Sequence, residues 1–268
     1  MYRLIALDVD GTLLTSDGHI LPSTVEAIAW ARSKGVRVVL STGRSAREAA
    51  WLTRLAGCDN RAVCLSGGAI ADAVTGRHAR QFPLPPEAVE AAIQIILRYP
   101  FLCLDVFAGP HNLVTPFTRK TFTALQPNDC MHQFMVESED PIGYIQEHKL
   151  EVCKIFAATT GPDLTEAVAR LQTIPGTETI NCDGANLEVL LSGVSKGAAL
   201  TLLAQEWGIP MEEVIAIGDS GNDLSMFAAA GMPVAMGNGS PAARAAARFV
   251  TDTNNRDGIA KAVRELLA

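Results

Sequence analysis

Short apolar segments alternate with helical segments near both ends of the chain, and this alternation restricts the fold more than any other feature. Leu4-Ile5-Ala6-Leu7 predicts a buried strand, and residues 36–40 predict a second one. Pro22 opens a helix between them, and Gly35 ends it. The alternation returns as helix 195–207, strand 214–217, helix 224–230, strand 232–236 and helix 256–267. The chain therefore predicts an α/β fold with a Rossmann-like, doubly wound parallel-sheet core.

The middle of the chain predicts a smaller domain inserted into this core. Thr42 and Lys196, which stand in the two alternating stretches, are 154 positions apart (196 − 42). One crossover connection needs far fewer residues, so an inserted domain explains the gap better than a long loop. We place the core at 1–82 and 190–268 and an α/β cap at 83–189, with the proline-rich segment 83–86 as a hinge.

The composition excludes several classes of protein. Of the 268 residues, 48% are hydrophobic and 19% are charged, which is enough apolar material for a sizeable core. The net charge of −7 argues against nucleic acid as a partner, because nucleic-acid binders present a basic face. No uncharged apolar stretch is long enough to cross a bilayer, and six cysteines without a CxxC pair indicate reduced thiols. These features predict a cytoplasmic protein without a membrane partner, either a monomer or a homodimer.

Four polar clusters stand where predicted strands end or helices begin. They are Asp8 with Asp10, Thr42-Gly43-Arg44, Lys196, and residues 219–223. Taken singly, each has an ordinary explanation as a helix cap, a turn or a solvated side chain. Ligands bind at the carboxyl ends of strands in an open parallel sheet, so we expect the clusters to converge. Carboxylates at one partly buried site would repel one another unless a divalent cation joined them, and oxygen ligands favour Mg²⁺.

The two aspartates at the end of the first strand suit phosphoryl transfer. Because Asp8 ends the strand, the next residues can turn over its edge, so that the carboxylates of Asp8 and Asp10 flank one reacting group. One carboxylate can attack phosphorus, while the other protonates the leaving oxygen and later takes a proton from water. Gly11 lets the backbone turn and present amides to phosphate. Lys196 and the metal would neutralise the phosphate oxygens.

Four motifs in this order resemble those of the haloacid dehalogenase-like phosphatase superfamily. They are Asp8-Val9-Asp10-Gly11-Thr12-Leu13-Leu14, Ser41-Thr42-Gly43-Arg44, Val194-Ser195-Lys196-Gly197 and Gly218-Asp219-Ser220-Gly221-Asn222-Asp223. The resemblance covers the whole predicted core. It implies a phosphatase that uses Mg²⁺ and forms an aspartyl-phosphate.

The resemblance also implies a role for each matching residue. Asp8 is then the nucleophile and a metal ligand, and Asp10 is the general acid and base, which also offers its backbone carbonyl to the metal. Arg44 is expected to anchor the substrate or the cap. The residues expected to bind the phosphate or the substrate are Gly11, Thr42, Gly43 and Lys196, and Lys196 also orients Asp8. Asp219 is expected to bind the metal, and Asp223 to support it directly or through a neighbouring residue. Asn222 is expected to contact phosphate or metal-bound water.

The place of the insertion resembles the Cof-type branch of the superfamily, whose α/β cap lies between the second and third motifs. Val234-Ala235-Met236-Gly237-Asn238 and Asp257-Gly258-Ile259 agree with that branch. The branch commonly has Asn-Gly-Ala where this chain has Ser66-Gly67-Gly68-Ala69, and we align Gly67 with the asparagine. Gly237-Asn238-Gly239 lacks the third glycine of a dinucleotide fingerprint and predicts a turn.

Two other functions stay open from the sequence. A phosphotransferase or mutase would pass the phosphoryl group to a sugar hydroxyl instead of water, and no sequence feature tests this. A non-catalytic sensor of phosphorylated metabolites could keep the fold, but Asp8, Asp10 and Lys196 are all present, and it is turnover that requires them. The expected partner is a small phosphorylated metabolite, with sugar phosphates ahead of phosphorylated cofactors such as pyridoxal phosphate or flavin mononucleotide.

Overall fold

The computed structural model describes residues 1–126, 129–159, 161, 163–182 and 184–268. The chain divides into two compact units. The core unit comprises Met1–Arg80 and Ser195–Ala268, and the inserted unit comprises Gln81–Val194. The sequence placed these divisions at 82/83 and 189/190.

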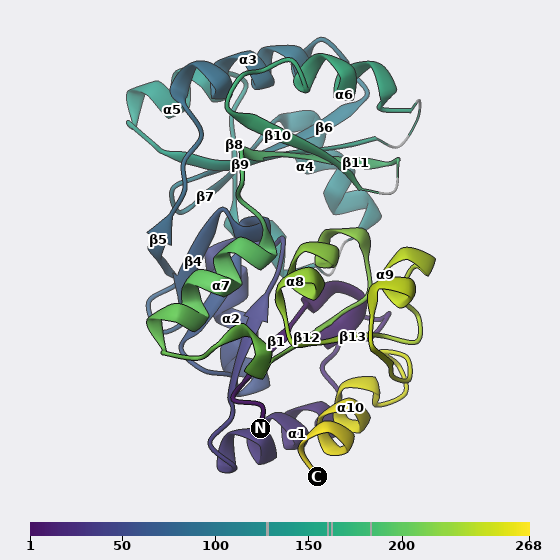
Figure 1. Cartoon of the computed structure of the whole chain (residues 1–268). Helices are drawn as coiled ribbons and strands as arrows, with labels where there is room; N and C mark the ends of the chain where they lie inside the picture. The colour runs from purple at the N-terminus through teal and green to yellow at the C-terminus, as the bar shows by residue number, and fades with distance from the viewer. Residues whose placement is uncertain (127–128, 160, 162, 183) are drawn as a thin grey trace. The chain divides into compact units, whose positions relative to one another are not determined.

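The core unit is built on a mostly parallel sheet (Figure 1). Its strands are, in sheet order, β14 (Phe249–Val250), β13 (Met232–Ala235), β12 (Val214–Gly218), β1 (Leu4–Leu7), β2 (Arg37–Ser41), β3 (Arg61–Cys64), β4 (Ala69–Asp72) and β5 (Arg77–Gln81). The strands from β14 to β3 run parallel, and β4 runs antiparallel to β3. The chain order reverses at β1, which lies between β12 and β2, and such a switch point opens a crevice at the carboxyl ends of the strands.

Helices form a layer on each face of this sheet. Leu4 and Ala6 of β1 belong to a buried cluster with α7 (Lys196–Glu206), α8 (Leu224–Ala229) and α9 (Pro241–Ala246). Successive side chains of a strand point to opposite faces, so Ile5 and Leu7 face the other layer. In that layer α1 (Pro22–Ser33) contacts β2, α2 (Ala46–Ala56) and α10 (Gly258–Leu267). The predicted α/β class and doubly wound core are confirmed.

The inserted unit has its own sheet. The strands are, in sheet order, β10 (Thr177–Cys182), β11 (Asn186–Leu191), β9 (Val152–Thr159), β6 (Leu102–Ala108), β7 (His111–Val114) and β8 (Met135–Glu137). Neighbouring strands are antiparallel, apart from the parallel pair β7 and β8. α4 (Pro116–Leu125) contacts β6 and β8, and Oγ1 of Thr118 accepts the N–H of Leu104 at 2.7 Å.

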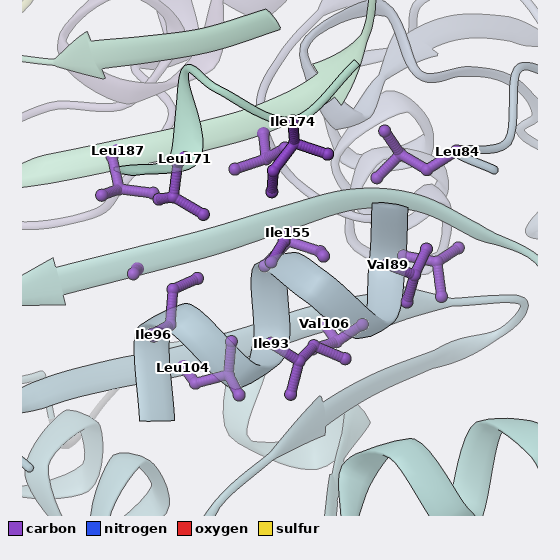
Figure 2. Packing of buried hydrophobic residues seen from close by; sticks show 14 of the residues in the cluster. Leu84, Val89, Ile93, Ile96, Leu104, Val106, Ile155, Leu171, Ile174 and Leu187 are labelled. Carbon is purple, nitrogen blue, oxygen red and sulfur yellow. The ribbon is translucent and has the colours of Figure 1, made fainter. Parts of the chain in front are cut away.

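The inserted unit also has its own hydrophobic core. The face of the sheet that carries Leu104 packs against α3 (Pro86–Leu97), α5 (Pro141–Glu147) and α6 (Thr165–Leu171). Figure 2 shows Leu104 and Val106 of β6 lying close to Ile93 and Ile96 of α3. Because this cluster draws its residues from within the inserted unit, the unit buries apolar surface without help from the core sheet.

The cysteines that the structure describes are reduced, as the sequence predicted. Cys58, Cys64, Cys103 and Cys153 are buried thiols that take part in no disulfide within the described part of the chain. Burial raises the pKa of Cys58 to about 12, which favours the protonated thiol. Among the described residues, no helix is both long and apolar enough to span a membrane.

Candidate active site

A buried lysine joins the first strand of the core sheet to the fourth motif. Asp8 directly follows β1 and donates its backbone N–H to the carbonyl of Ile217 at 2.9 Å. Lys196 is the first residue of α7, and its Nζ donates to Oδ1 of Asp8 and to Oδ1 of Asp223, both at 2.7 Å. It also donates to Oδ1 of Asn222 at 3.2 Å. These bonds bring the first, third and fourth motifs together.

The charged groups of this network are almost completely withdrawn from solvent. The exposed fraction is 4% for Asp8, 1% for Lys196 and 0% for Asp223. Burial raises the pKa of Asp8 well above its usual range, and the carboxylates of Asp223, Asp219 and Asp10 raise it further against the charge of Lys196. Burial by itself would lower the pKa of Lys196, but Asp223 and Asp8 outweigh it and raise that pKa above its ordinary value. Lys196 is therefore a permanent positive charge in a site with excess negative charge.

Three carboxylates lie close enough to share a cation. Asp8, Asp219 and Asp223 each offer an oxygen, and these oxygens lie within 4.8 Å of one another. Burial and the charge of Asp223 raise the pKa of Asp219 to about 6, against a hydrogen bond from Oγ1 of Thr12 to Oδ1 of Asp219 at 3.1 Å. Oxygen donors with unneutralised negative charge are what Mg²⁺ requires, so the residues present fit the predicted metal.

Asp223 fixes the loop that carries Asp219. Its Oδ2 accepts the backbone N–H of Asp219 at 2.9 Å and that of Ser220 at 3.0 Å. A Cβ at Gly218 would lie 2.5 Å from Cγ of Asp223, so glycine leaves the room that this carboxylate occupies. Since Lys196 holds the other oxygen, both oxygens of Asp223 already bond to the chain. Of the two roles expected for Asp223, this arrangement favours support of the metal through a neighbouring residue over direct binding of the metal.

Gly11 is the tightest point of the turn Val9–Leu13, which follows Asp8. Its φ of +80° lies in the left-handed region, and a Cβ there would lie 2.4 Å from Oδ2 of Asp219. Only glycine fits such a position. The backbone amides that the sequence assigns to phosphate therefore belong to a turn that lies directly against the Asp219 carboxylate.

Thr42 lies at the same edge of the sheet as Asp8. β1 and β2 are parallel neighbours, and the two residues follow their carboxyl ends. Thr42 is fully buried, and its Oγ1 accepts the backbone N–H of Arg44 at 3.1 Å across Gly43. This bond orients the hydroxyl, which keeps its own hydrogen to donate to a ligand.

The guanidinium of Arg44 lies on Asp10. Its Nη2 and Nε donate to the Asp10 carboxylate at 2.8 and 3.1 Å, and its Nη1 donates to Oε1 of Glu48 at 3.2 Å. Glu48 is buried and forms a reciprocal capping box with Ser45 at the start of α2. The side chain of Asp10 is 60% exposed and is not among the three clustered carboxylates. The sequence assigned Arg44 to the substrate or the cap and missed Glu48, although Ser-x-x-Glu is the signature of such a box.

The backbone at Gly67, the residue that we align with an asparagine of the branch, leaves no room for a side chain. Gly67 has a φ of +102°, and a Cβ there would lie 2.2 Å from the carbonyl oxygen of Ser195, the residue before Lys196. An asparagine could not be accommodated. Ser66 is buried and has a φ of +56°, a left-handed conformation that asparagine adopts more readily than most residues. In this backbone an asparagine side chain would fit at position 66 and not at position 67.

The loop of Gly237-Asn238-Gly239, in which the sequence predicted a turn and to which it gave no role in the site, contacts two of the motifs. The N–H of Ser240 donates to the carbonyl of Asp219 at 2.7 Å, and Nδ2 of Asn238 donates to the carbonyl of Gly11 at 2.8 Å. An open cavity of about 430 Å³ lies beside these contacts, and Asp10, Arg44 and Asn238 are among the residues that line it.

Comparison with known proteins identifies the family. A family model described as haloacid dehalogenase-like hydrolase matches residues 5–263. The chain is 31% identical to the 5-amino-6-(5-phospho-D-ribitylamino)uracil phosphatase YcsE of Bacillus subtilis, over 98% of this chain and 94% of that protein. It is 28% identical to the pyridoxal phosphate phosphatase YbhA of Escherichia coli, over 97% of this chain and 96% of that protein.

A solved structure agrees with these sequence matches. The structure of a haloacid dehalogenase-like hydrolase from B. subtilis matches with a TM-score of 0.86 at 25% identity, over 98% of this chain and 99% of that one. The resemblance carried by the four motifs is confirmed. The chain belongs to the haloacid dehalogenase-like hydrolase family.

Proposed function

We propose that this protein is a Mg²⁺-dependent phosphatase that hydrolyses a small phosphorylated metabolite through an aspartyl-phosphate on Asp8. The observation that carries the proposal is the buried network of Asp8, Lys196 and Asp223 beside the Asp219 carboxylate. Several buried charges at one strand edge are costly to maintain, and clusters with strongly shifted pKa values are typical of active sites. The relatives named as phosphatases of phosphorylated metabolites support the same class of reaction.

The two aspartates divide the chemistry. Lys196 holds Oδ1 of Asp8 and so fixes the rotation of the nucleophile. Asp8 attacks phosphorus, the bond to the leaving oxygen breaks, and Asp10 gives that oxygen a proton. Asp10 then takes a proton from the water that attacks the aspartyl-phosphate. This second step restores the Asp8 carboxylate and releases inorganic phosphate.

The other motif residues would bind the phosphoryl oxygens. The candidate donors are the amides of the turn Val9–Leu13 on the first motif and the hydroxyl of Thr42 on the second. Nζ of Lys196 on the third motif donates its three N–H groups to Asp8, Asn222 and Asp223, so it would exchange one of these partners for a phosphoryl oxygen. Oδ1 of Asn222 accepts from Lys196 and from Oγ of Ser220 at 2.7 Å, which leaves its Nδ2 to donate to phosphate. Preorganised donors of this kind stabilise the charge that develops in the transition state.

The metal would be held by Asp8, Asp219 and the backbone carbonyl of Asp10, with Asp223 fixing the loop of Asp219. When bound, Mg²⁺ supplies positive charge that neutralises the phosphoryl oxygens. Burial and the neighbouring carboxylates raise the pKa of Asp8, and the positive charge of a bound cation would act in the opposite direction.

We assign the choice of substrate to the inserted unit, acting as a cap that contacts the leaving group. The motif residues all lie in the core unit or at its boundary, and none of them falls in the interior of Gln81–Val194. Sugar phosphates are the leading substrate class on family grounds, followed by phosphorylated cofactors. A panel of phosphorylated metabolites, assayed for phosphate release with Mg²⁺, would identify the substrate.

Hydrolysis of p-nitrophenyl phosphate by the purified protein tests the reaction class. Activity should disappear in EDTA and return with Mg²⁺, and Asp8→Asn should lower kcat by at least about 10³-fold and leave no covalent intermediate. Asp17→Asn, an exposed aspartate in the same segment, is the control and should keep full activity. Undiminished turnover in the chelator, or a near-native rate for Asp8→Asn, would contradict the proposal. Transfer of phosphate to an added sugar, in place of its release, would support the phosphotransferase alternative.

A further inference from the structure

Three asparagines outside the four motifs hold the segment that follows the nucleophile. The bonds run from Nδ2 of Asn238 to the carbonyl of Gly11 (2.8 Å), from Nδ2 of Asn254 to the carbonyl of Leu14 (2.9 Å), and from the N–H of Ser16 to Oδ1 of Asn255 (3.0 Å). The first bond acts on the catalytic turn itself, because Gly11 lies directly after Asp10. The other two act further along the segment.

The amide of Asn238 has only one orientation that satisfies both of its neighbours. The backbone N–H of Asn254 points at one end of the amide at 2.9 Å, and an N–H requires an acceptor. That end must therefore be Oδ1. The other end is then Nδ2, which is the donor that the Gly11 carbonyl requires. The backbone of Asn254 thus sets the orientation of Asn238, and Asn238 in turn holds Gly11.

This bond fixes a peptide plane in the turn Val9–Leu13. The carbonyl of Gly11 and the N–H of Thr12 belong to one planar trans peptide, so they point in opposite directions. Holding the carbonyl at Asn238 therefore aims the Thr12 N–H to the other side of the plane. The hydroxyl of Thr12 donates to Asp219 at 3.1 Å, and Gly11 packs on the same carboxylate. The Gly11–Thr12 peptide is thus held at its carbonyl by Asn238 and at its Thr12 side chain by Asp219.

The loop of Asn238 also holds the residue on the other side of this peptide. Two positions after Asn238, the N–H of Ser240 donates to the carbonyl of Asp219 at 2.7 Å. Gly239 between them passes close to Asp219, since a Cβ there would lie 3.1 Å from that carbonyl oxygen. One short loop therefore sets the distance between the turn that follows the nucleophile and the residue that is to bind the metal.

We propose that Asn238 is a positioning residue for phosphoryl transfer: by donating to the Gly11 carbonyl it holds the Gly11–Thr12 peptide so that the Thr12 N–H can bind a phosphoryl oxygen in the transition state. This inference rests on the proposed phosphatase function. Asn238 itself does not need to touch the substrate. Its effect comes from keeping a donor preorganised, and loss of one such donor typically costs about 10²–10³-fold in kcat.

The variant Asn238→Asp tests this role without changing the volume of the side chain. One carboxylate oxygen still accepts from the N–H of Asn254, but the other now faces the Gly11 carbonyl, and two acceptors repel. The peptide should tilt away, and kcat/KM for p-nitrophenyl phosphate should fall by about 10–100-fold. The inhibition constant of orthovanadate, which mimics the transition state, should rise by a similar factor. Asn238→Ala removes the donor without adding repulsion, so its vanadate constant should rise by a smaller factor.

Asn255→Asp is the matched control on the same segment. Its oxygen still accepts from the N–H of Ser16, and the Ser16 hydroxyl, which accepts from Nδ2 of Asn255 at 2.9 Å, can reverse and donate to the new carboxylate. We expect vanadate inhibition within about twofold of the unaltered protein, because this contact lies beyond the catalytic turn.

The vanadate constant separates positioning from a merely structural role. A structural loss lowers the melting temperature and the fraction of active molecules, but it leaves the inhibition constant of the remaining active molecules unchanged. An unchanged vanadate constant for Asn238→Asp, or an equal rise for Asn255→Asp, would overturn the proposal. If Asn238→Asp does not fold, Asn238→Ala decides, and an unchanged constant for it counts against the role. Absence of Mg²⁺-dependent hydrolysis in the unaltered protein would instead reject the phosphatase itself.

Discussion

Asp8 and Asp10 stand two positions apart in the chain, and their side chains have opposite surroundings. Asp8 is 4% exposed and bonds to the ammonium of Lys196, whereas the side chain of Asp10 is 60% exposed and bonds to the guanidinium of Arg44. A nucleophile must be held still, while an acid and base must reach both the leaving group and water. The different surroundings of Asp8 and Asp10 suit the two roles that we propose for them.

The contact between Arg44 and Asp10 predicts that the two residues act as a unit. Asp10→Asn should lower kcat for an alkyl phosphate by about 10²–10⁴-fold, because the leaving oxygen is no longer protonated. Arg44→Ala should lower it through the same step, since Asp10 loses the bonds that hold it. The double variant should then be no slower than Asp10→Asn alone, which is the sign of coupled residues. Steady-state rates on alkyl and aryl phosphates would measure this.

A control variant and a contrary outcome complete this comparison of the single and double variants of Asp10 and Arg44. Arg47→Ala, which changes an exposed arginine at the start of α2 three positions after Arg44, is the control and should leave the rates within about twofold. If the effects of Asp10→Asn and Arg44→Ala multiply, and Arg44→Ala mainly raises KM, then Arg44 acts on the substrate, as the sequence first indicated.

The raised pKa of Asp219, about 6, predicts a pH dependence of metal binding. Protons compete with Mg²⁺ for this carboxylate, so the dissociation constant for Mg²⁺ should rise by about tenfold per unit as the pH falls below about 6. In the metal-free protein the folded state binds a proton that the unfolded state releases between the ordinary carboxyl pKa and about 6. Metal-free stability should therefore fall as the pH rises through that window. Thermal melts with and without Mg²⁺ at pH 5 and pH 7.5 would check both trends.

Asp219→Asn is the matched variant for this prediction. It removes a charge from a crowded carboxylate cluster and keeps an oxygen that can accept from Thr12. The metal-free variant should melt higher than the metal-free parent at pH 7.5, and Mg²⁺ should no longer stabilise it. A parent protein that melts at the same temperature with and without Mg²⁺ at that pH would rule out the site.

At the scale of elements, the central strands and the helices beside them followed from the sequence, whereas the edge strands β4, β5 and β14 and the contacts between loops did not. Helix 195–207 and strand 214–217 were predicted, and the structure has α7 at Lys196–Glu206 and β12 at Val214–Gly218. Their signals are local: an apolar run, a capping serine, a terminating glycine. The bond from Asn238 to Gly11 joins positions 227 apart, and no local pattern encodes such a pair.

The convergence of the site was predictable for a different reason. Parallel strands end at one edge, so Asp8, Thr42 and Asp219 had to meet once the sheet was recognised. The partners of each side chain were not predictable in the same way, as Arg44 and its bond to Asp10 show. The conformation of the turn at Ser66 and Gly67 was not predicted either, because residues other than glycine that adopt a left-handed conformation have no clear sequence signature.

The turn after β3 predicts an unusually costly substitution. Gly67→Ala combines a φ of +102° with a Cβ 2.2 Å from the carbonyl of Ser195, so the start of α7 must move, and Lys196 with it. We expect a loss of at least about 3 kcal/mol in the free energy of unfolding and a fall in kcat. Gly57, at the end of α2, has a φ of +72° but open space around a new Cβ. Gly57→Ala should therefore lower the free energy of unfolding by about 1 kcal/mol and leave kcat unchanged. Chemical denaturation would compare them, and equal losses would mean that the close approach to Ser195 can relax.

The whole molecule consists of two units with separate hydrophobic cores. One cluster draws on β1, α7 and α8 of the core unit, and the other draws on α3, α6 and the sheet of the inserted unit. The chain enters the inserted unit after Arg80 and leaves it before Ser195, one position from Lys196. A substitution inside the second cluster therefore need not disturb the buried network of Asp8, Lys196 and Asp223. If the inserted unit selects the substrate, as we propose, its preference can change while the network in the core unit stays the same.

Exchange of the inserted unit is the test at this scale. If Gln81–Val194 is replaced by the matching segment of a family member with another substrate, the ranking of phosphorylated metabolites should follow the donor of that segment. Mg²⁺ dependence should survive, and kcat/KM for p-nitrophenyl phosphate should stay within about tenfold, because a small aryl group makes few contacts with a cap. Asp8→Asn in the exchanged protein is the control and should be inactive. If the ranking of phosphorylated metabolites instead remains that of the unaltered protein, the choice of substrate lies in the core unit. The cavity lined by Asp10, Arg44 and Asn238 would then be the candidate site for the leaving group, because it lies beside the proposed acid.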